Sequence, residues 1–431
     1  MPDNPKMKVD LVFEGGGAKG MVLIGALEVL FGAGYSPGRL LGTSAGAITA
    51  LALAAGYTIP ELNAALSEKD EQGKPIFTTF LGDPPVLDAA AIGRSAIRTL
   101  LAEINMSLVW DPVEKRLDDR IVNHLAGSVW GRHLFSFLEL GGLFSAECFI
   151  SWATEKLNSG EVNGTPRRFG DLTLKEFFDQ TQVELTLVAA DTTWSRALWL
   201  NHRTAPDCPV VYAARMSMSV PFIWPEIEWQ EEWGSYHTWN PATRQLEPID
   251  IAGHMVVDGG VLSNFPIALF LADSPDVTAV VGQATTRNVL GLLIDESLQV
   301  PNRPERQNTF PPFLSKLSFV DRLKRLVNTA TGAHDNLAKA LYKANVVRLP
   351  AGGYETTQFG MSDKEREALV NAGREAMIAF LGISPAGGAT PAMPGLPAFD
   401  SGTIASPNFA ISDPLAVDYA NNAAANLLGQ Q

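Results

Sequence analysis

Residues 9–20 of the chain read VDLVFEGGGAKG, an apolar run that ends in a glycine-rich turn. The run predicts a short buried strand, and residues 21–31 repeat apolar side chains at helical spacing. Strand, glycine turn and helix in this order open an α/β unit. The turn at the start of the helix exposes backbone N–H groups with little side chain in the way, which suits an anionic oxygen; it consists of Gly15, Gly16, Gly17, Ala18, Lys19 and Gly20.

A second strand-to-helix turn follows closely in the sequence. Residues 39–41 predict a brief strand, and residues 45–55 predict an Ala- and Leu-rich helix that ends before Gly56. Between them stands a G-x-S-x-G pattern, whose small residues permit the tight reversal that pushes a serine hydroxyl outward. This predicted nucleophile elbow consists of Gly42, Thr43, Ser44, Ala45 and Gly46. The two turns together indicate acyl-transfer chemistry at Ser44.

The glycine turn also fits two nucleotide-binding patterns, and both fail on their other requirements. Gly15, Gly17 and Gly20 match G-x-G-x-x-G, but that fingerprint expects an acidic residue about twenty positions further on. Residues 36–41 contain neither Asp nor Glu. A phosphate-binding P-loop needs Lys and then Ser or Thr after its second glycine, whereas Met21 follows Gly20 here. The sequence therefore predicts no nucleotide cofactor.

A serine nucleophile needs a base, and Asp258 is the candidate that the residues themselves suggest. It follows a predicted strand at residues 255–257 and precedes Gly259 and Gly260, so its carboxylate can enter a crowded site lined by main chain. None of the six histidines lies in a turn with a comparable setting. Because an unperturbed Asp has a pKa of about 3.9, burial or hydrogen bonding would have to bring that pKa toward neutrality.

Composition narrows the class of protein. The chain has 431 residues, of which 46% are hydrophobic, as expected for a globular fold. A formal charge of −14 argues against binding to nucleic acid, which requires a basic surface. Two cysteines are too few for a disulfide framework or a zinc site. Without a signal peptide or a transmembrane stretch, we expect a cytoplasmic protein, with transient membrane association or non-classical export left open.

The remaining segments carry weaker signals. Residues 57–170 are predicted to be mostly helical and are interpreted as a cap insertion; residues 183–190, 196–200 and 277–281 are predicted strands. A hairpin is expected to turn at Gly234-Ser235 among four tryptophans, for which core packing is favoured over a role in an acyl-chain pocket. Residues 313–342 predict a basic amphipathic helix, interpreted first as a solvated face and second as a membrane-docking element.

Three motifs in this order resemble the patatin-like phospholipases: GGGAKG at 15–20, GTSAG at 42–46 and DGG at 258–260. Residues 214–221 and 261–266 are similar to the segments that flank the family's aspartate, and the resemblance runs from about residue 8 to residue 349. It implies a three-layer α/β/α fold with a mostly parallel central sheet. It also implies a Ser-Asp dyad of Ser44 and Asp258 that hydrolyses acyl esters of lipids through an acyl-enzyme, without metal or other cofactor.

The resemblance assigns roles in the glycine turn and a class of substrate, whereas the helical insertion and the C-terminal tail lie outside its motifs and are inferred from composition and pattern. The N–H groups around Gly15, Gly16 and Gly17 would form the oxyanion hole, and Lys19 would anchor the loop. A hydrolase domain would span residues 1–382, with the helical cap at about 57–170, and residues 383–431 would be a loosely ordered extension rich in Ala, Pro and Gly. The expected partner is a lipid or acyl-ester substrate, with peripheral contact to a membrane.

Two alternatives remain open at this point. Ser44, Asp258 and His334 follow the chain order of α/β-hydrolases, so a Ser-His-Asp esterase that uses His334 is one of them. The other is a lipid-binding protein without catalysis. The presence of both Ser44 and Asp258 argues against it, because a binding module needs neither.

Overall fold

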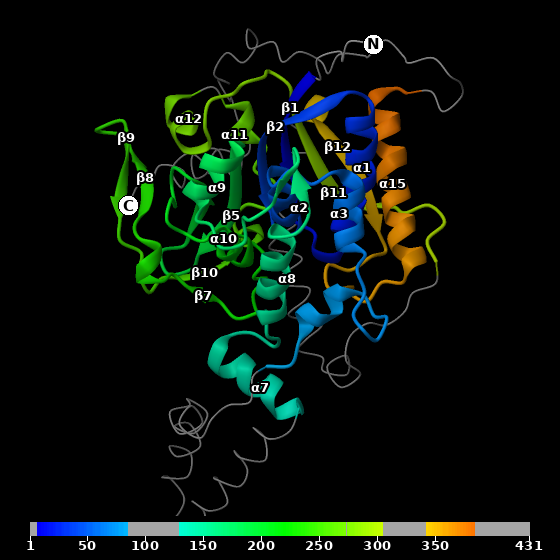
Figure 1. The fold of residues 1–431 in the computed structure, drawn as a ribbon, viewed down its shortest axis with the longest axis horizontal. Helices are drawn as coiled ribbons and strands as arrows, with labels where there is room; N and C mark the ends of the chain where they lie inside the picture. Colours follow the sequence, from blue (N-terminus) through cyan, green and yellow to red (C-terminus); the bar gives the residue numbers. More distant parts are fainter. Residues whose placement is uncertain (1–6, 85–128, 273, 305–341, 384–431) are drawn as a thin grey trace, which may run out of the picture.

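The structure, a computed structural model, describes residues 7–84, 129–272, 274–304 and 342–383. Its centre is an eight-stranded sheet (Figure 1). The strands are β1 (Met7–Phe13), β2 (Tyr35–Thr43), β5 (Leu185–Asp191), β6 (Arg196–Leu200), β7 (Ile227–Glu228), β10 (Met255–Asp258), β11 (Val289–Gln299) and β12 (Val346–Gly352). They follow the order β12-β11-β1-β2-β5-β10-β7, with β6 also paired to β5. The first five are parallel, whereas β10 pairs antiparallel with β5 and β7, and β6 with β5.

Helices cover both faces of this sheet. In β1, Leu11 and Phe13 belong to one hydrophobic cluster and Val12 to another, as the alternation of side chains along a strand requires. The helices that contribute to the first cluster are α1 (Met21–Gly32), α2 (Ala45–Ala54), α3 (Ile59–Leu66), α8 (Glu147–Leu157), α9 (Leu174–Thr181), α10 (Val210–Ser217) and α15 (Asp363–Leu381). Those of the second are α11 (Ala268–Leu271) and α12 (Pro275–Val281). The predicted three-layer α/β/α fold with a mostly parallel sheet is confirmed.

Local sequence explains where several of these helices begin. α3, α9 and α15 each start with a capping box, in which a Ser or Thr side chain and a Glu three residues later satisfy each other's backbone N–H groups. Close helix packing then depends on small residues. α1 and α15 lie side by side (Figure 1), and a Cβ atom on Gly25 would come within 1.8 Å of the Val370 carbonyl oxygen. Glycine at this position therefore sets the distance between the two helices.

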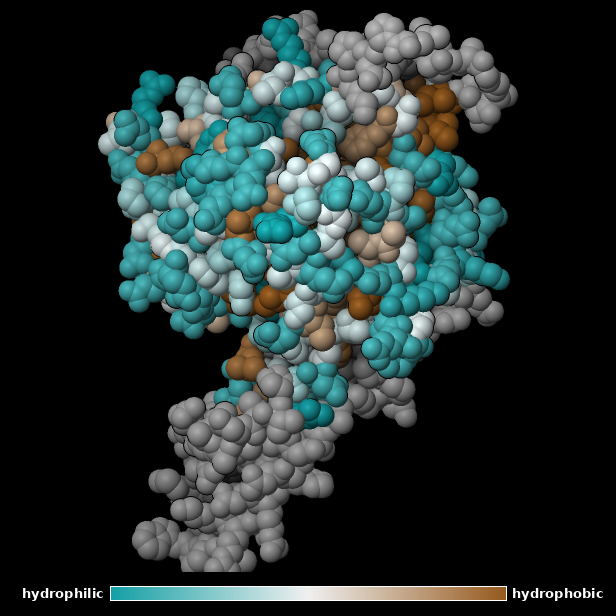
Figure 2. Space-filling model, viewed as in Figure 1, coloured by the Kyte–Doolittle hydropathy of each residue, from teal (hydrophilic) through white to brown (hydrophobic). Residues whose placement is uncertain are grey.

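Smaller elements complete the described chain. α7 (Val129–Leu140) lies at the lower end of the view in Figure 1. The 3-10 turns are η1 (Gly17–Gly20), η2 (Ile76–Leu81), η3 (Glu231–Trp233), η4 (Gly259–Val261) and η6 (Lys343–Asn345). Two short hairpins pair β3 (Glu161–Val162) with β4 (Thr165–Pro166), and β8 (Tyr236–Asn240) with β9 (Gln245–Ile249). Hydrophilic residues cover most of the face in Figure 2. Nowhere in the described ranges does a helix have the length and apolar character needed to cross a membrane.

Two predicted elements are wrong. Residues 277–281 form helix α12, because Pro275 occupies its first turn and Ser274 its N-cap position, signals that outweigh a short apolar run. The hairpin does not turn at Gly234-Ser235, since Gly234 only ends η3 and β8 pairs with the later β9. The basic stretch lies outside the described residues except for Tyr342, as does the C-terminal extension beyond residue 383.

Candidate active site

One edge of β5 brings two distant parts of the chain together. β6 occupies the other edge of this strand, so β2 and β10 must share the remaining one. On it, Thr43 of β2 pairs with Val188, and Asp258 of β10 pairs with Ala189, the next residue of β5. The two strands therefore meet end to end. Ser44, which directly follows Thr43, and Asp258, the last residue of β10, face each other at this junction.

Ser44 occupies the reversal between β2 and α2 with a strained backbone. Its φ of 53° and ψ of −122° lie in a region that residues with a side chain rarely adopt, at a cost of about 1–3 kcal/mol. Its N–H donates to the Ser217 hydroxyl at 3.1 Å, and its carbonyl accepts the N–H of Ala47 at 2.9 Å. Only 6% of the residue is exposed. The serine hydroxyl therefore lies at the N-terminus of α2, where the helix dipole favours negative charge.

Asp258 is almost fully buried and is held on both sides. The Ser44 side chain lies close enough to its carboxylate to lower the pKa of Asp258. The N–H of Gly260 donates to Oδ1 at 2.8 Å, and the N–H of Asp258 itself donates to the Ser219 carbonyl at 2.9 Å. Burial raises the pKa of Asp258 to about 7, while the bonds from Gly260 and Ser44 act in the opposite direction. The carboxyl group is thus poised to gain or lose a proton near neutral pH.

The glycine turn packs directly against this pair. A Cβ atom on Gly15 would lie 3.0 Å from Cβ of Ser44, and one on Gly20 would lie 2.8 Å from Cβ of Ala45. Across the site, a Cβ atom on Gly259 would lie 2.5 Å from the Val188 carbonyl oxygen. Side chains at these positions would push the turn, the serine and the aspartate apart.

The backbone N–H groups of the glycine turn divide into two sets. Those of Gly15, Ala18 and Lys19 donate to main-chain oxygens at 3.4, 2.9 and 3.2 Å. Among the residues that the structure describes, no acceptor is found for the N–H groups of Gly16 and Gly17. The geometry therefore narrows the candidate oxyanion donors to these two.

Charged side chains fix the turn to the neighbouring strand. Lys19 is 4% exposed and forms an ion pair with Glu296 of β11. The buried Glu14, just before the turn, accepts hydrogen bonds from the Asn264 side chain at 3.2 Å and from the N–H of Ile294. Lys19 thus has a partner within the protein, an arrangement suited to the predicted anchoring of the loop.

Small residues within the elbow are required by close backbone contacts. A Cβ atom on Gly42 would lie 2.2 Å from the carbonyl oxygen of Gly46, and one on Gly46 would lie 2.5 Å from that of Phe13. Thr43 is fully buried, and its hydroxyl donates to the Ser263 carbonyl at 3.3 Å. The elbow therefore has no room for larger side chains.

We expect Gly42→Ala to lower the free energy of unfolding by about 1–3 kcal/mol, because the added methyl group forces two backbone segments apart. Urea denaturation of the purified variant measures this loss. Gly32→Ala is the matched control: it lies at the end of α1 with no atom within 4 Å of an added Cβ, and its stability should stay the same or rise slightly. Equal losses in both variants would contradict the steric account.

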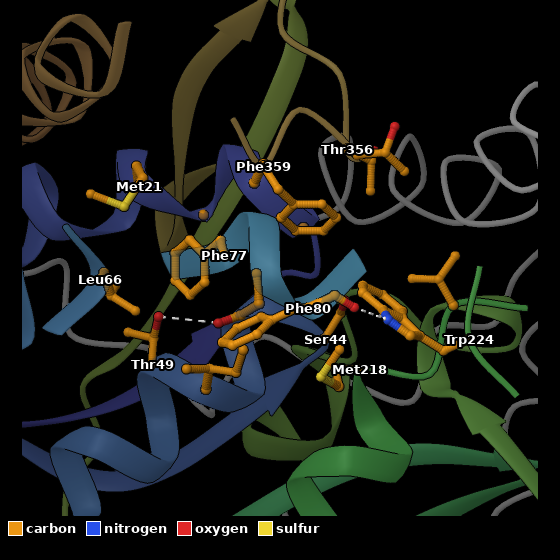
Figure 3. A pocket seen from close by; sticks show the side chains of 17 residues that line it. Met21, Ser44, Thr49, Leu66, Phe77, Phe80, Met218, Trp224, Thr356 and Phe359 are labelled. Carbon is orange, nitrogen blue, oxygen red and sulfur yellow. Dashed lines mark hydrogen bonds between the residues drawn. The ribbon is translucent and has the colours of Figure 1, made fainter. Parts of the chain in front are cut away.

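Ser44 opens into an apolar pocket. Figure 3 shows the rings of Phe77, Phe80, Trp224 and Phe359 around it, together with Ser44. The full lining comprises Gly17, Ala18, Gly20, Met21, Ser44, Ala45, Ile48, Thr49, Leu66, Phe77, Phe80, Met218, Val220, Trp224, Thr356, Thr357 and Phe359. This pocket suits a hydrocarbon chain that approaches the serine.

Two of the described histidines take part in other contacts. His254 bonds the buried Asp191 at 2.9 Å, and His133 bonds the Leu143 carbonyl at 2.6 Å; neither lines the pocket. His334 lies outside the described residues. In the described part of the chain, no group of three or more His, Cys, Asp or Glu side chains is arranged to hold a metal ion.

Several lining residues were missed from the sequence. Thr356, Thr357 and Phe359 follow β12, and only the pairing of β12 with β11 carries them to the glycine turn, where the Thr356 carbonyl accepts the N–H of Ala18. Phe77 and Phe80 fall within the predicted cap, where their spacing of three was the only signal. The four tryptophans at residues 224–239 divide between the two roles considered for them, core packing and a place in the lining of a pocket. Trp224 lines the pocket, while the others are buried in the hydrophobic clusters: Trp229, Trp233 and Trp239.

The chain is similar to several known proteins. The family model described as "Patatin-like phospholipase" matches residues 11–271. The chain is 28% identical to the uncharacterized protein YqhO of Bacillus subtilis (strain 168), covering 87% of this chain and 98% of that protein. It is 22% identical to the probable lipid hydrolase 463L of Invertebrate iridescent virus 6, covering 61% and 63% of the two chains. Among solved structures, VipD from Legionella pneumophila aligns with a TM-score of 0.40 and 19% identity, over 88% of this chain and 67% of that one.

The family match spans more than half of the chain. It includes the glycine turn, Ser44 and Asp258. The chain therefore belongs to the patatin-like phospholipases, a family of lipid hydrolases.

Proposed function

We propose that this protein hydrolyses acyl esters of lipids with Ser44 as nucleophile and Asp258 as its base. One observation carries the proposal: the Ser44 side chain adjoins the buried Asp258 carboxylate at the edge of an apolar pocket. Nucleophile and base within hydrogen-bond reach are the signature of an activated hydroxyl. The alternative with His334 requires a histidine between the two groups, whereas here the Ser44 side chain itself acts on the pKa of the Asp258 carboxyl group.

The proposed reaction proceeds through an acyl-enzyme. Asp258 accepts the Ser44 proton while Oγ attacks the ester carbonyl carbon, and the N–H groups of Gly16 and Gly17 stabilise the tetrahedral oxyanion. Collapse of this intermediate breaks the ester bond, and the leaving alcohol takes the proton from Asp258. Water then loses a proton to Asp258 as its oxygen attacks the acyl-enzyme carbonyl. Cleavage of the bond between the acyl carbon and Oγ releases the fatty acid, and Oγ takes the proton back from Asp258, which regenerates the Ser44 hydroxyl and the carboxylate.

The apolar pocket supports an acyl chain as the group next to the scissile ester. It contains few polar side chains, so it favours hydrocarbon over a charged head group. Transient contact with a lipid surface belongs to the same proposal, because the substrate must leave a bilayer or micelle to enter the pocket. The contact requires no spanning segment.

Covalent labelling tests the proposed nucleophile directly. We expect a fluorophosphonate probe to modify folded wild-type protein at Ser44, with the site identified by peptide mass spectrometry, because only an activated serine reacts. Ser44→Ala and heat-denatured wild-type protein are the controls and should remain unlabelled. Folded wild-type protein without an adduct would favour a lipid-binding protein that lacks catalysis.

A further inference from the structure

A second apolar pocket lies beyond the first along helices α2 and α3. Ile48 of α2 lines both pockets; Ala45 lies on the side of the first and Leu51 on the side of the second. On α3, Leu66 lines the first pocket and Leu62 lines the second. Successive turns of the same two helices therefore lead from one pocket to the other, away from Ser44.

Four aromatic rings stand between the two pockets. Phe77 and Phe80 of η2 line the first pocket, and Phe149 and Trp152 of α8 line the second. Ring centroids are 5.1 Å apart for Phe77 and Phe80, and 5.4 Å apart for Phe80 with both Phe149 and Trp152. Phe80 thus contacts the other three rings. We call this group the aromatic partition.

Phe80 is held in place by its own backbone and by burial. Its carbonyl accepts the indole N–H of Trp224 at 2.7 Å, and the residue is 2% exposed. Figure 3 shows this bond and the Phe80 ring among the side chains that surround the first pocket. The partition is therefore a packed wall rather than a loose side chain.

The polar groups around the second pocket already have partners. The Tyr57 hydroxyl donates to the Lys156 carbonyl at 2.6 Å, and the Lys156 ammonium pairs with Glu68 at 2.8 Å. The indole N–H of Trp152 donates to the same Glu68 carboxylate at 3.3 Å. With these atoms satisfied and the other lining residues apolar, the second pocket suits hydrocarbon and not a polar head group.

We propose that the two pockets are compartments of one acyl channel and that Phe80 sets the length of the acyl chain that the enzyme accepts. This inference rests on the proposed function, because it assumes that the acyl chain extends from Ser44 into the first pocket. An acyl chain that ends at the aromatic partition buries all of its methylenes. A longer acyl chain must displace the packed rings or leave its end in water. Phe80 is thus a specificity-determining residue.

The test compares p-nitrophenyl butyrate, octanoate and palmitate as substrates of wild type and Phe80→Ala. We expect the ratio of kcat/KM for palmitate over octanoate to rise about tenfold in the variant, since burial of about two further methylenes suffices for that factor. The rate with butyrate is measured in parallel, so that a change close to Ser44 is separated from a change in chain-length preference. An unchanged ratio in folded variant protein would overturn the inference.

Further variants separate a channel from a general loss of packing. Phe77→Ala removes a half-buried ring from the aromatic partition and should shift the ratio in the same direction. Phe169→Ala removes a buried ring that packs on Phe177 outside both linings, and should leave the ratio unchanged. The double variant Phe80→Ala/Ala65→Phe refills the second pocket from α3 and should restore the wild-type ratio. A ratio that stays high in the double variant would contradict passage through that pocket.

A binding measurement keeps this inference apart from the proposed reaction. Octanoate and palmitate are titrated against wild type and Phe80→Ala while they displace a fluorescent apolar probe, a readout that needs no catalysis. A selective gain in palmitate affinity in the variant supports the channel even if no ester is hydrolysed. Such binding without hydrolysis would contradict the proposed reaction but not the channel. Equal palmitate affinities in the two folded proteins would overturn the channel, whatever the hydrolysis rates.

Discussion

Ser44→Ala should hydrolyse acyl esters about 10⁴-fold more slowly than the wild-type protein, the largest effect that we expect from any single substitution. The variant retains the glycine turn, Asp258 and the apolar pocket, but it has no oxygen with which to form the acyl-enzyme. Steady-state hydrolysis of p-nitrophenyl butyrate measures the change in kcat/KM. Release of fatty acid from a mixed lipid extract, followed by mass spectrometry, checks it with natural substrates.

Ser217→Ala is the matched control for this variant. In the wild-type protein the Ser217 hydroxyl accepts the N–H of Ser44 at 3.1 Å, and Ser217 does not line the pocket. Loss of this hydroxyl therefore disturbs the elbow without removing the proposed nucleophile. We expect a much smaller decrease, about tenfold. Wild-type turnover by folded Ser44→Ala would refute the proposed nucleophile.

Asp258→Asn is expected to lower kcat/KM by about 10²–10⁴-fold, because an amide cannot accept the Ser44 proton. The substitution conserves shape, so the bond from the Gly260 N–H can persist and the fold should remain intact. Circular dichroism and thermal unfolding establish that the variant is folded before its rate is compared. Undiminished hydrolysis would remove Asp258 from the mechanism.

The pH profile tests the same residue in the wild-type protein. The base must be ionised, and burial raises the pKa of Asp258 to about 7. Log kcat/KM should therefore be flat above that pH and fall about one unit per pH unit below it, because protonation removes the acceptor. The residual activity of Asp258→Asn should lack this dependence.

His334→Ala distinguishes the remaining enzymatic alternative. If Asp258 is the base, this variant should keep both the wild-type rate and the wild-type pH profile. A loss comparable to that of Asp258→Asn would instead favour a Ser-His-Asp arrangement.

The parts of the fold that sequence could predict are those decided by local pattern. Residues 9–13, 21–31 and 45–55 carry clear strand or helix periodicity with glycine punctuation, and they agree with β1, α1 and α2 to within a few residues. The glycine turn and elbow could be assigned because backbone reversal and close packing restrict which residues are tolerated there. Local chemistry thus reveals where a nucleophile could be placed.

The parts that were missed depend on contacts between distant segments. β11 forms a central strand beside β1, yet its segment Asp295-Glu296-Ser297 is polar. The buried Asp295 accepts hydrogen bonds from Ser297 and pairs with Arg348 of β12 at 2.6 Å. No local window contains both partners. Phe359 and Phe80 likewise reach the pocket from separate elements, so their roles follow from the tertiary arrangement rather than from a motif.

The meeting of β2 and β10 on one edge of β5 makes the separation of Ser44 and Asp258 a property of the main chain. A slip of β10 by a single residue would turn the aspartate to the opposite face of the sheet. Insertions or deletions elsewhere therefore preserve the separation of Ser44 and Asp258 as long as β2 and β10 keep their register on β5. The long connection from α2 to β10 supplies α8 and much of the walls of the two apolar pockets. Evolution can therefore redesign the pocket-lining helices while the spacing of Ser44 and Asp258 stays constant.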